Sequence, residues 1–83
     1  MTETITINLD VFERRFLLGL AERGGRMEMD SRKLTTEVSD ALMSLQVKGA
    51  VKIEPQMFVF MKDYILTPAG SNLVDLIRKG ITA

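Results

Sequence analysis

The stretch YILTPAG (residues 64–70) changes its hydrophobic pattern halfway along. Its first three residues are typical of a strand, whereas the apolar residues after the proline recur at helical spacing. Thr67 can accept a hydrogen bond from the backbone of a first helical turn, and Pro68 has no N–H to leave unpaired there. The stretch therefore predicts a strand that passes directly into a helix. That helix ends near Lys79–Gly80 and carries three residues inward: Leu73, Leu76 and Ile77.

A second helix is delimited by signals in the first third of the chain. Asp10 and Glu13 have the spacing of a capping box, and Gly24-Gly25 is typical of a helix end. We expect a helix of about three turns between these signals. Its apolar residues at helical spacing are Phe12, Phe16, Leu17, Leu20 and Ala21.

The middle of the chain predicts a third helix, from Ser31 to Lys48, which Gly49 ends. Thr35-Thr36 leaves open a break into two short helices, but the unbroken apolar register favours one helix or a barely kinked pair. The residues that fall within one arc of about 100° and form the core face are Leu34, Val38, Ala41, Leu42 and Leu45.

Two strands are predicted before this helix by alternation of apolar and polar residues. Residues 4–9 (TITINL) alternate with a period of two, which favours a half-buried strand over a loose N-terminal arm. Residues 26–30 (RMEMD) alternate in the same way and predict a short strand.

A hairpin follows the helix. Residues 50–54 predict a strand that Pro55 ends, because proline has no N–H for the ladder. Five apolar residues follow at 57–61, Lys62-Asp63 interrupts the run, and the strand resumes at 64–66.

Length and composition indicate one small globular domain, residues 1–83, with a thin core. Basic and acidic residues are equal in number, so a surface that binds nucleic acid would have to be basic locally. No apolar run approaches the roughly 20 residues of a membrane span, and the N-terminus has no signal-peptide features. We expect a cytoplasmic protein that does not enter the membrane.

Composition also argues against an enzyme. The chain has neither cysteine nor histidine, which removes thiolate chemistry, the commonest general base and the commonest metal ligand. Asp30, Glu37 and Asp40 are interpreted as surface charge and not as catalytic carboxylates. We expect no catalytic residues, no cofactor and no metal.

Two motifs resemble those of winged helix-turn-helix regulators. Residues 39–51 (SDALMSLQVKGAV) are similar to a recognition helix that runs through L-x-x-L-x-x-x-G into the wing. Residues 64–70 resemble the Y-x-L-T-x-x-G that follows the wing in MarR-type and PadR-type transcriptional regulators. The resemblance implies an α+β, winged-helix-like fold with about three helices and a β-hairpin wing. It further implies a homodimer that binds double-stranded DNA to regulate transcription.

If the chain binds DNA, its contacts should come from the helix and from the wing. Arg32, Thr36 and Ser39 occupy the start of the predicted helix, and further cations stand around it. The alternative is that these cations are scattered over a solvated surface. The expected DNA contacts are Arg26, Arg32, Lys33, Thr36, Ser39, Lys52 and Lys62.

The apolar wing favours a second function, a protein–protein interaction module without DNA binding. Such a module would be a small inhibitor or adaptor of the kind that phages and plasmids encode. The run 57–61 is apolar on both faces, so it predicts either an interface or an inner strand covered by Ile5, Ile7 and the last helix. The expected interface residues are Met57, Phe58, Phe60, Met43 and Val47.

Overall fold

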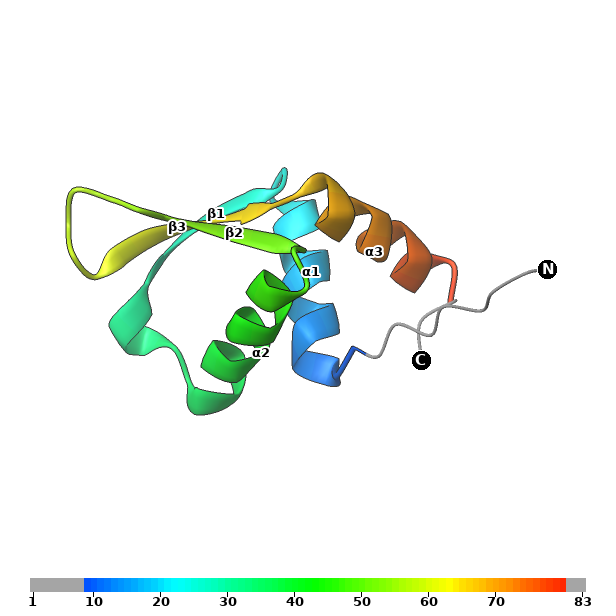
Figure 1. The fold of residues 1–83 in the computed structure, drawn as a ribbon, viewed down its shortest axis with the longest axis horizontal. Helices are drawn as coiled ribbons and strands as arrows, with labels where there is room; N and C mark the ends of the chain where they lie inside the picture. Colours follow the sequence, from blue (N-terminus) through cyan, green and yellow to red (C-terminus); the bar gives the residue numbers. More distant parts are fainter. Residues whose placement is uncertain (1–8, 81–83) are drawn as a thin grey trace.

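The computed structural model describes residues 9–80, which form helices and a small β-sheet (Figure 1). The predicted α+β class is confirmed, and the arrangement is compatible with a winged-helix-like fold. In chain order the elements are α1 (Val11–Glu22), β1 (Arg26–Asp30), the 3-10 helix η1 (Ser31–Lys33), α2 (Thr36–Val47), β2 (Val51–Pro55), β3 (Met61–Leu66) and α3 (Pro68–Arg78).

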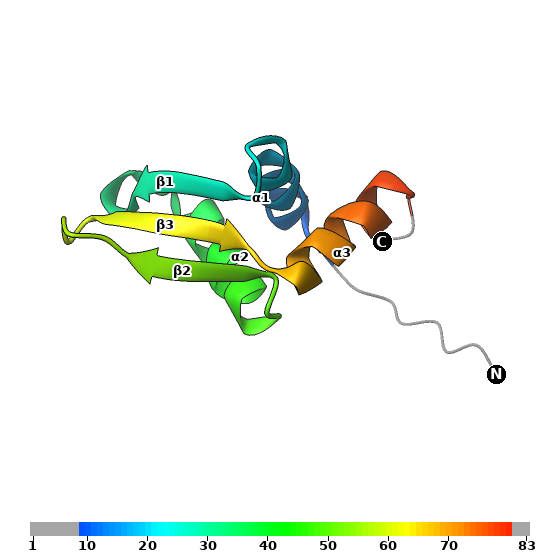
Figure 2. The ribbon, with the colours of Figure 1, turned by 90° about the horizontal axis from the view of Figure 1, so that it is seen from above.

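The sheet is antiparallel with the strand order β1-β3-β2, so β3 lies in the middle (Figure 2). Tyr64 of β3 is paired with Met27 of β1 and with Ile53 of β2, and paired residues share one face of a sheet. That face packs on the helices. The Tyr64 ring is buried there, 6.0 Å from Phe16 of α1 in an edge-to-face contact.

Helix α1 begins and ends as its capping signals predict. The carboxylate of Asp10 accepts from the Glu13 N–H at 2.8 Å, and the Glu13 side chain accepts from the Asp10 N–H. Gly24 and Gly25 both have positive φ after the helix, a conformation that strains residues with a Cβ. The strand predicted over residues 4–9 lies outside the described residues except for Leu9, which is buried and not in a strand.

The single helix expected from Ser31 to Lys48 is wrong, because the chain breaks before Thr36. Asp30 accepts from the Arg32 N–H at 2.9 Å and caps the short η1. Thr35 then caps α2 by accepting from the Val38 N–H at 3.2 Å. These two local caps satisfy backbone donors that a continuous helix would have paired internally. Leu34 still packs against the core from the linker.

The strand boundaries in the hairpin also differ from the prediction. Residues 57–60 form a turn and not a strand, while Lys62-Asp63 lies inside β3. Asp63 is held in the strand by Arg26 of β1, at 2.5 Å, and by the side chain of Gln56, at 2.6 Å. Cross-strand contacts therefore keep two charged residues in the ladder, which the sequence pattern had suggested would interrupt it.

The junction at residues 64–70 is confirmed and also closes the fold. Thr67 Oγ1 accepts from the Gly70 N–H at 3.0 Å and donates to the Gly49 carbonyl at 2.5 Å. The Thr67 N–H donates to the Ala50 carbonyl at 3.1 Å. The start of α3 is thereby attached to the α2–β2 connection.

A partly buried ion pair joins α1 to Lys48, at the C-terminal end of α2. Glu13 is 5% exposed. Its carboxylate lies 2.7 Å from Lys48 Nζ and accepts a hydrogen bond from Ser44 Oγ at 3.3 Å. Glu13 therefore both caps its own helix and pairs with the next one.

None of the helices in the described part of the chain is long and apolar enough to cross a bilayer.

Candidate functional site: helix α2 and the hairpin

The hairpin tip is a projecting apolar turn. It consists of residues 57–60 and lies at the far end of the hairpin, away from α3 (Figure 1). The exposed fractions of Met57, Phe58, Val59 and Phe60 are 94%, 70%, 80% and 47%. The alternative of an inner, covered strand is therefore wrong for the described residues, and Met57, Phe58 and Phe60, the residues expected at an interface, are accessible for one. An exposed apolar cluster of this kind is characteristic of contact surfaces.

The base of the tip is attached to η1. The Ser31 N–H donates to the Phe60 carbonyl at 2.7 Å, and the Arg32 guanidinium lies 4.1 Å from the centroid of the Phe60 ring. A cation over an aromatic face is attracted by the ring quadrupole. Phe60 thus has an intramolecular contact and is less exposed than Met57, Phe58 and Val59.

Helix α2 presents a second apolar area. Met43 is 64% exposed and Val47 is 85% exposed. Asp40, Ser44 and Lys48 surround them on the outer face of the helix. Both residues were expected at an interface, and both are accessible for one.

Three of the expected DNA-contacting cations are paired with carboxylates. Arg26 lies 2.5 Å from Asp63, Arg32 lies 2.8 Å from Asp30, and Lys52 lies 3.2 Å from Glu54. Each carboxylate neutralises the positive charge that a contact with a DNA phosphate would require.

Pairing with an arginine lowers the pKa of two of these carboxylates, Asp30 and Asp63. Hydrogen bonds from the Arg32 side chain and backbone lower the pKa of Asp30 from its usual 3.8 to about 2. Hydrogen bonds from Arg26 and Gln56 lower the pKa of Asp63 in the same direction.

The other expected contacts lie near the start of α2 and along the hairpin. Thr36 and Ser39 are exposed on the first turns of α2. Lys33 and Lys62 form no ion pair with any other described residue. From residue 26 to residue 63 the sequence holds as many acidic as basic residues, so this surface has no net positive charge.

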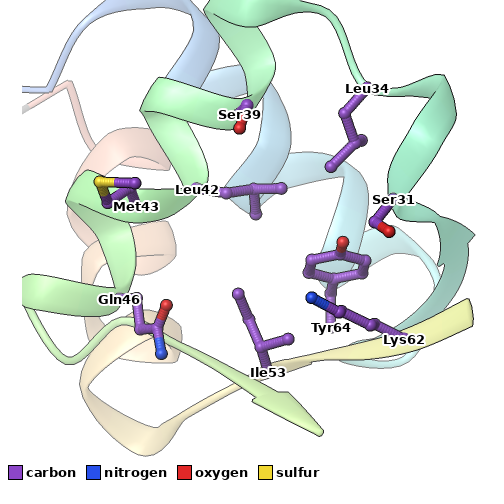
Figure 3. Close-up of a pocket in the computed structure, with 9 residues that line it drawn as sticks. All are labelled: Ser31, Leu34, Ser39, Leu42, Met43, Gln46, Ile53, Lys62 and Tyr64. Carbon is purple, nitrogen blue, oxygen red and sulfur yellow. The ribbon is translucent and has the colours of Figure 1, made fainter. Parts of the chain in front are cut away.

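A pocket of about 230 Å³ lies between α2 and the hairpin (Figure 3). Nothing in the sequence pattern indicated it, because its walls come from η1, α2, β2 and β3. Burial raises the pKa of the Tyr64 hydroxyl at its floor. The lining residues are Ser31, Leu34, Ser39, Leu42, Met43, Gln46, Ile53, Lys62 and Tyr64.

The described residues hold no group of three or more acidic side chains placed to bind a metal ion. Comparisons with protein-family models, with curated proteins and with solved structures gave no match to this chain.

Proposed function

We propose that this protein is a protein-interaction module whose main contact element is the hairpin tip. The observation that carries the proposal is the exposure of Met57, Phe58 and Val59 on a projecting turn. Between Pro55 and Met61 no side chain is charged. Aromatic and methionine side chains are enriched at the centres of interfaces, and a few of them contribute most of the binding energy.

The shape of the tip indicates the chemistry of its partner. A convex apolar turn buries little area against another convex turn, so two tips in contact would form a poor interface. A concave apolar site on a different protein would surround the Phe58 ring, which can bury about 150–250 Å². We therefore assign the tip to a partner protein with such a site, with the role of an inhibitor or adaptor.

The test replaces Met57 and Phe58, two large and highly exposed side chains of the hairpin tip. In Met57→Ser/Phe58→Ser, Phe60 and its contact with Arg32 stay intact, so circular dichroism should be unchanged. A photo-crosslinking residue at position 58, with position 37 as control, identifies the partner, which is then purified. Affinity for that purified partner should fall at least about thirtyfold in the double variant, the effect of losing one hot-spot residue.

The matched control is Val11→Ser, which removes an exposed apolar side chain from α1, outside the expected interface. It should leave the affinity within about threefold of the wild type, since positions outside the hot spots cost little. Equal losses in the control and in the tip variant would contradict a specific role for the tip.

Self-association is the alternative that light scattering distinguishes. An apolar concavity beside α1 and β1 is one that a second copy's tip would enter, and it is lined by Phe12, Phe16, Met27, Met29 and Val38, with Arg15 and Arg23 among its other lining residues. A dimeric wild type that becomes monomeric in Met57→Ser/Phe58→Ser would replace the proposed partner with a second copy.

Binding of duplex DNA is a second candidate function, which two observations favour. The arrangement of α2 and the hairpin is compatible with a winged-helix-like fold, and Lys33 and Lys62 have no ion pair among the described residues. Apolar wedges in DNA-bending proteins act beside cations that hold the phosphates. Here the tip itself has none, so the interaction module ranks first.

A further inference from the structure

The pocket between α2 and the hairpin combines an aliphatic body with donor groups. Leu34, Leu42 and Ile53 supply apolar wall, and Leu42 and Ile53 point toward each other across the space (Figure 3). A volume of about 230 Å³ exceeds the 150 Å³ or so of a cavity that holds benzene. The pocket therefore has room for a small organic molecule and not only for water.

Lys62 is the one charged side chain among the described residues that line the pocket. Lys62 is partly buried and lines the pocket beside Tyr64, and its ammonium group forms neither an ion pair nor a hydrogen bond with another described residue. Lys62 and Tyr64 are alternate residues of β3, so their side chains share a face of the sheet. None of the described residues that line the pocket is acidic. An unpaired cation without a carboxylate partner leaves this site electrostatically suited to an anion.

Further hydrogen-bond donors line the same pocket. The Tyr64 hydroxyl points into the pocket with Ser31 near it, whereas Ser39 and Gln46 lie on α2 on another wall (Figure 3). Neither these hydroxyl groups nor the Gln46 amide forms a side-chain hydrogen bond with another described residue. Hydroxyl, amide and ammonium groups are together able to satisfy the lone pairs of a carboxylate.

We propose that this pocket binds a small organic carboxylate, with its charged end at Lys62 and Tyr64 and its apolar body between Leu42 and Ile53. A single cation matches a monoanion better than it matches a phosphate. The aliphatic walls favour an alkyl chain or a single ring over a sugar or a nucleotide. Binding here does not depend on whether the hairpin tip binds a protein.

The probe is hexanoate, titrated into the full-length chain and followed by NMR. Saturable shifts should concentrate on the methyl groups of Leu42 and Ile53 and on the ring of Tyr64. Hexanamide has the same alkyl chain without the charge and should bind at least about tenfold more weakly, the loss of a charge-assisted hydrogen bond. This comparison uses only the wild type, so it decides the question even if a variant fails to fold.

The variant that tests the cation is Lys62→Met, which keeps an unbranched side chain of nearly the same length and removes its charge. It should weaken hexanoate by at least about tenfold. Lys52→Met is the control, because Lys52 lies on the same hairpin but outside the pocket and is paired with Glu54. Shifts scattered over exposed lysines, equal binding of hexanoate and hexanamide, or an unchanged affinity in Lys62→Met would each overturn the proposal.

Discussion

At the scale of the residue, Asp30 combines a structural and an electrostatic role. Its carboxylate caps η1 through the Arg32 N–H and accepts from the Arg32 side chain at 2.8 and 3.1 Å. Arg32 in turn lies over the Phe60 ring at the base of the tip. One carboxylate therefore orients the cation that holds the hairpin tip against η1.

The pH dependence of stability should reveal this pair. A carboxyl whose folded pKa is depressed stabilises the fold above its ordinary pKa, and that stability is lost as the pH falls through the folded value. For Asp30 the window runs from pH 3.8 down to about 2. Asp30→Asn should lower the melting temperature at pH 7, and the difference from the wild type should shrink toward pH 2.

Arg32→Met provides the reciprocal check, because it removes the same pair from the cationic side. Its difference from the wild type should shrink over the same pH window. A difference for Asp30→Asn that stays constant from pH 7 to pH 2 would contradict the role given to the carboxylate.

At the scale of the element, the start of α3 is held so closely that only glycine fits at position 70. A Cβ added to Gly70 would collide with the Ala50 carbonyl oxygen and come within 2.8 Å of a Leu66 methyl carbon. This close approach is what allows the hydrogen bond from the Thr67 N–H to the Ala50 carbonyl. Helix α3 therefore docks on the α2–β2 connection through backbone as well as side-chain contacts.

Two glycine substitutions should have opposite effects on stability. Gly70→Ala should destabilise the fold by about 1–3 kcal/mol, the usual cost of overpacking, since backbone must shift. Gly19→Ala is the control within α1, where an added Cβ meets nothing within 4 Å. It should stabilise by about 0.5–1 kcal/mol through helix propensity. Denaturant unfolding measures both, and a stabilising Gly70→Ala would disprove the close contact.

At the scale of the whole molecule, the balance of charge limits the salt dependence that DNA binding would show. Arg26, Arg32 and Lys52 are already paired with carboxylates, which leaves Lys33 and Lys62 as the unpaired cations among the expected contacts in the described chain. The logarithm of a duplex affinity falls with the logarithm of salt concentration by about 0.9 for each phosphate neutralised.

Any duplex binding should therefore show a slope no steeper than about −2. Fluorescence anisotropy with a labelled duplex at several salt concentrations measures it, and Lys33→Gln should reduce the slope by about 1. A slope of about −4 or steeper would show that the paired arginines exchange their carboxylates for phosphates, and would favour the regulator over the interaction module.

Local patterns were enough to predict most of the elements. The capping box at Asp10–Glu13, the glycines at 24–25 and the Thr67-Pro68 start of α3 all involve neighbours within four residues, and the structure confirms all three. The break before Thr36 was left open by the pattern and decided wrongly, because the apolar register of Leu34 continues through a linker that is not helical.

The sequence by itself therefore determined where α1 and α3 start and stop and which faces turn inward, since these depend on short-range hydrogen bonding and on periodicity. Tertiary structure decided the charge pairs between distant residues. Asp63 meets Arg26 from 37 positions away, and Lys48 meets Glu13 from 35. It also decided that Lys62 borders a pocket and that Phe58 stays exposed. The reason is that charge pairing and burial act through space, so they are settled only when distant segments are brought together.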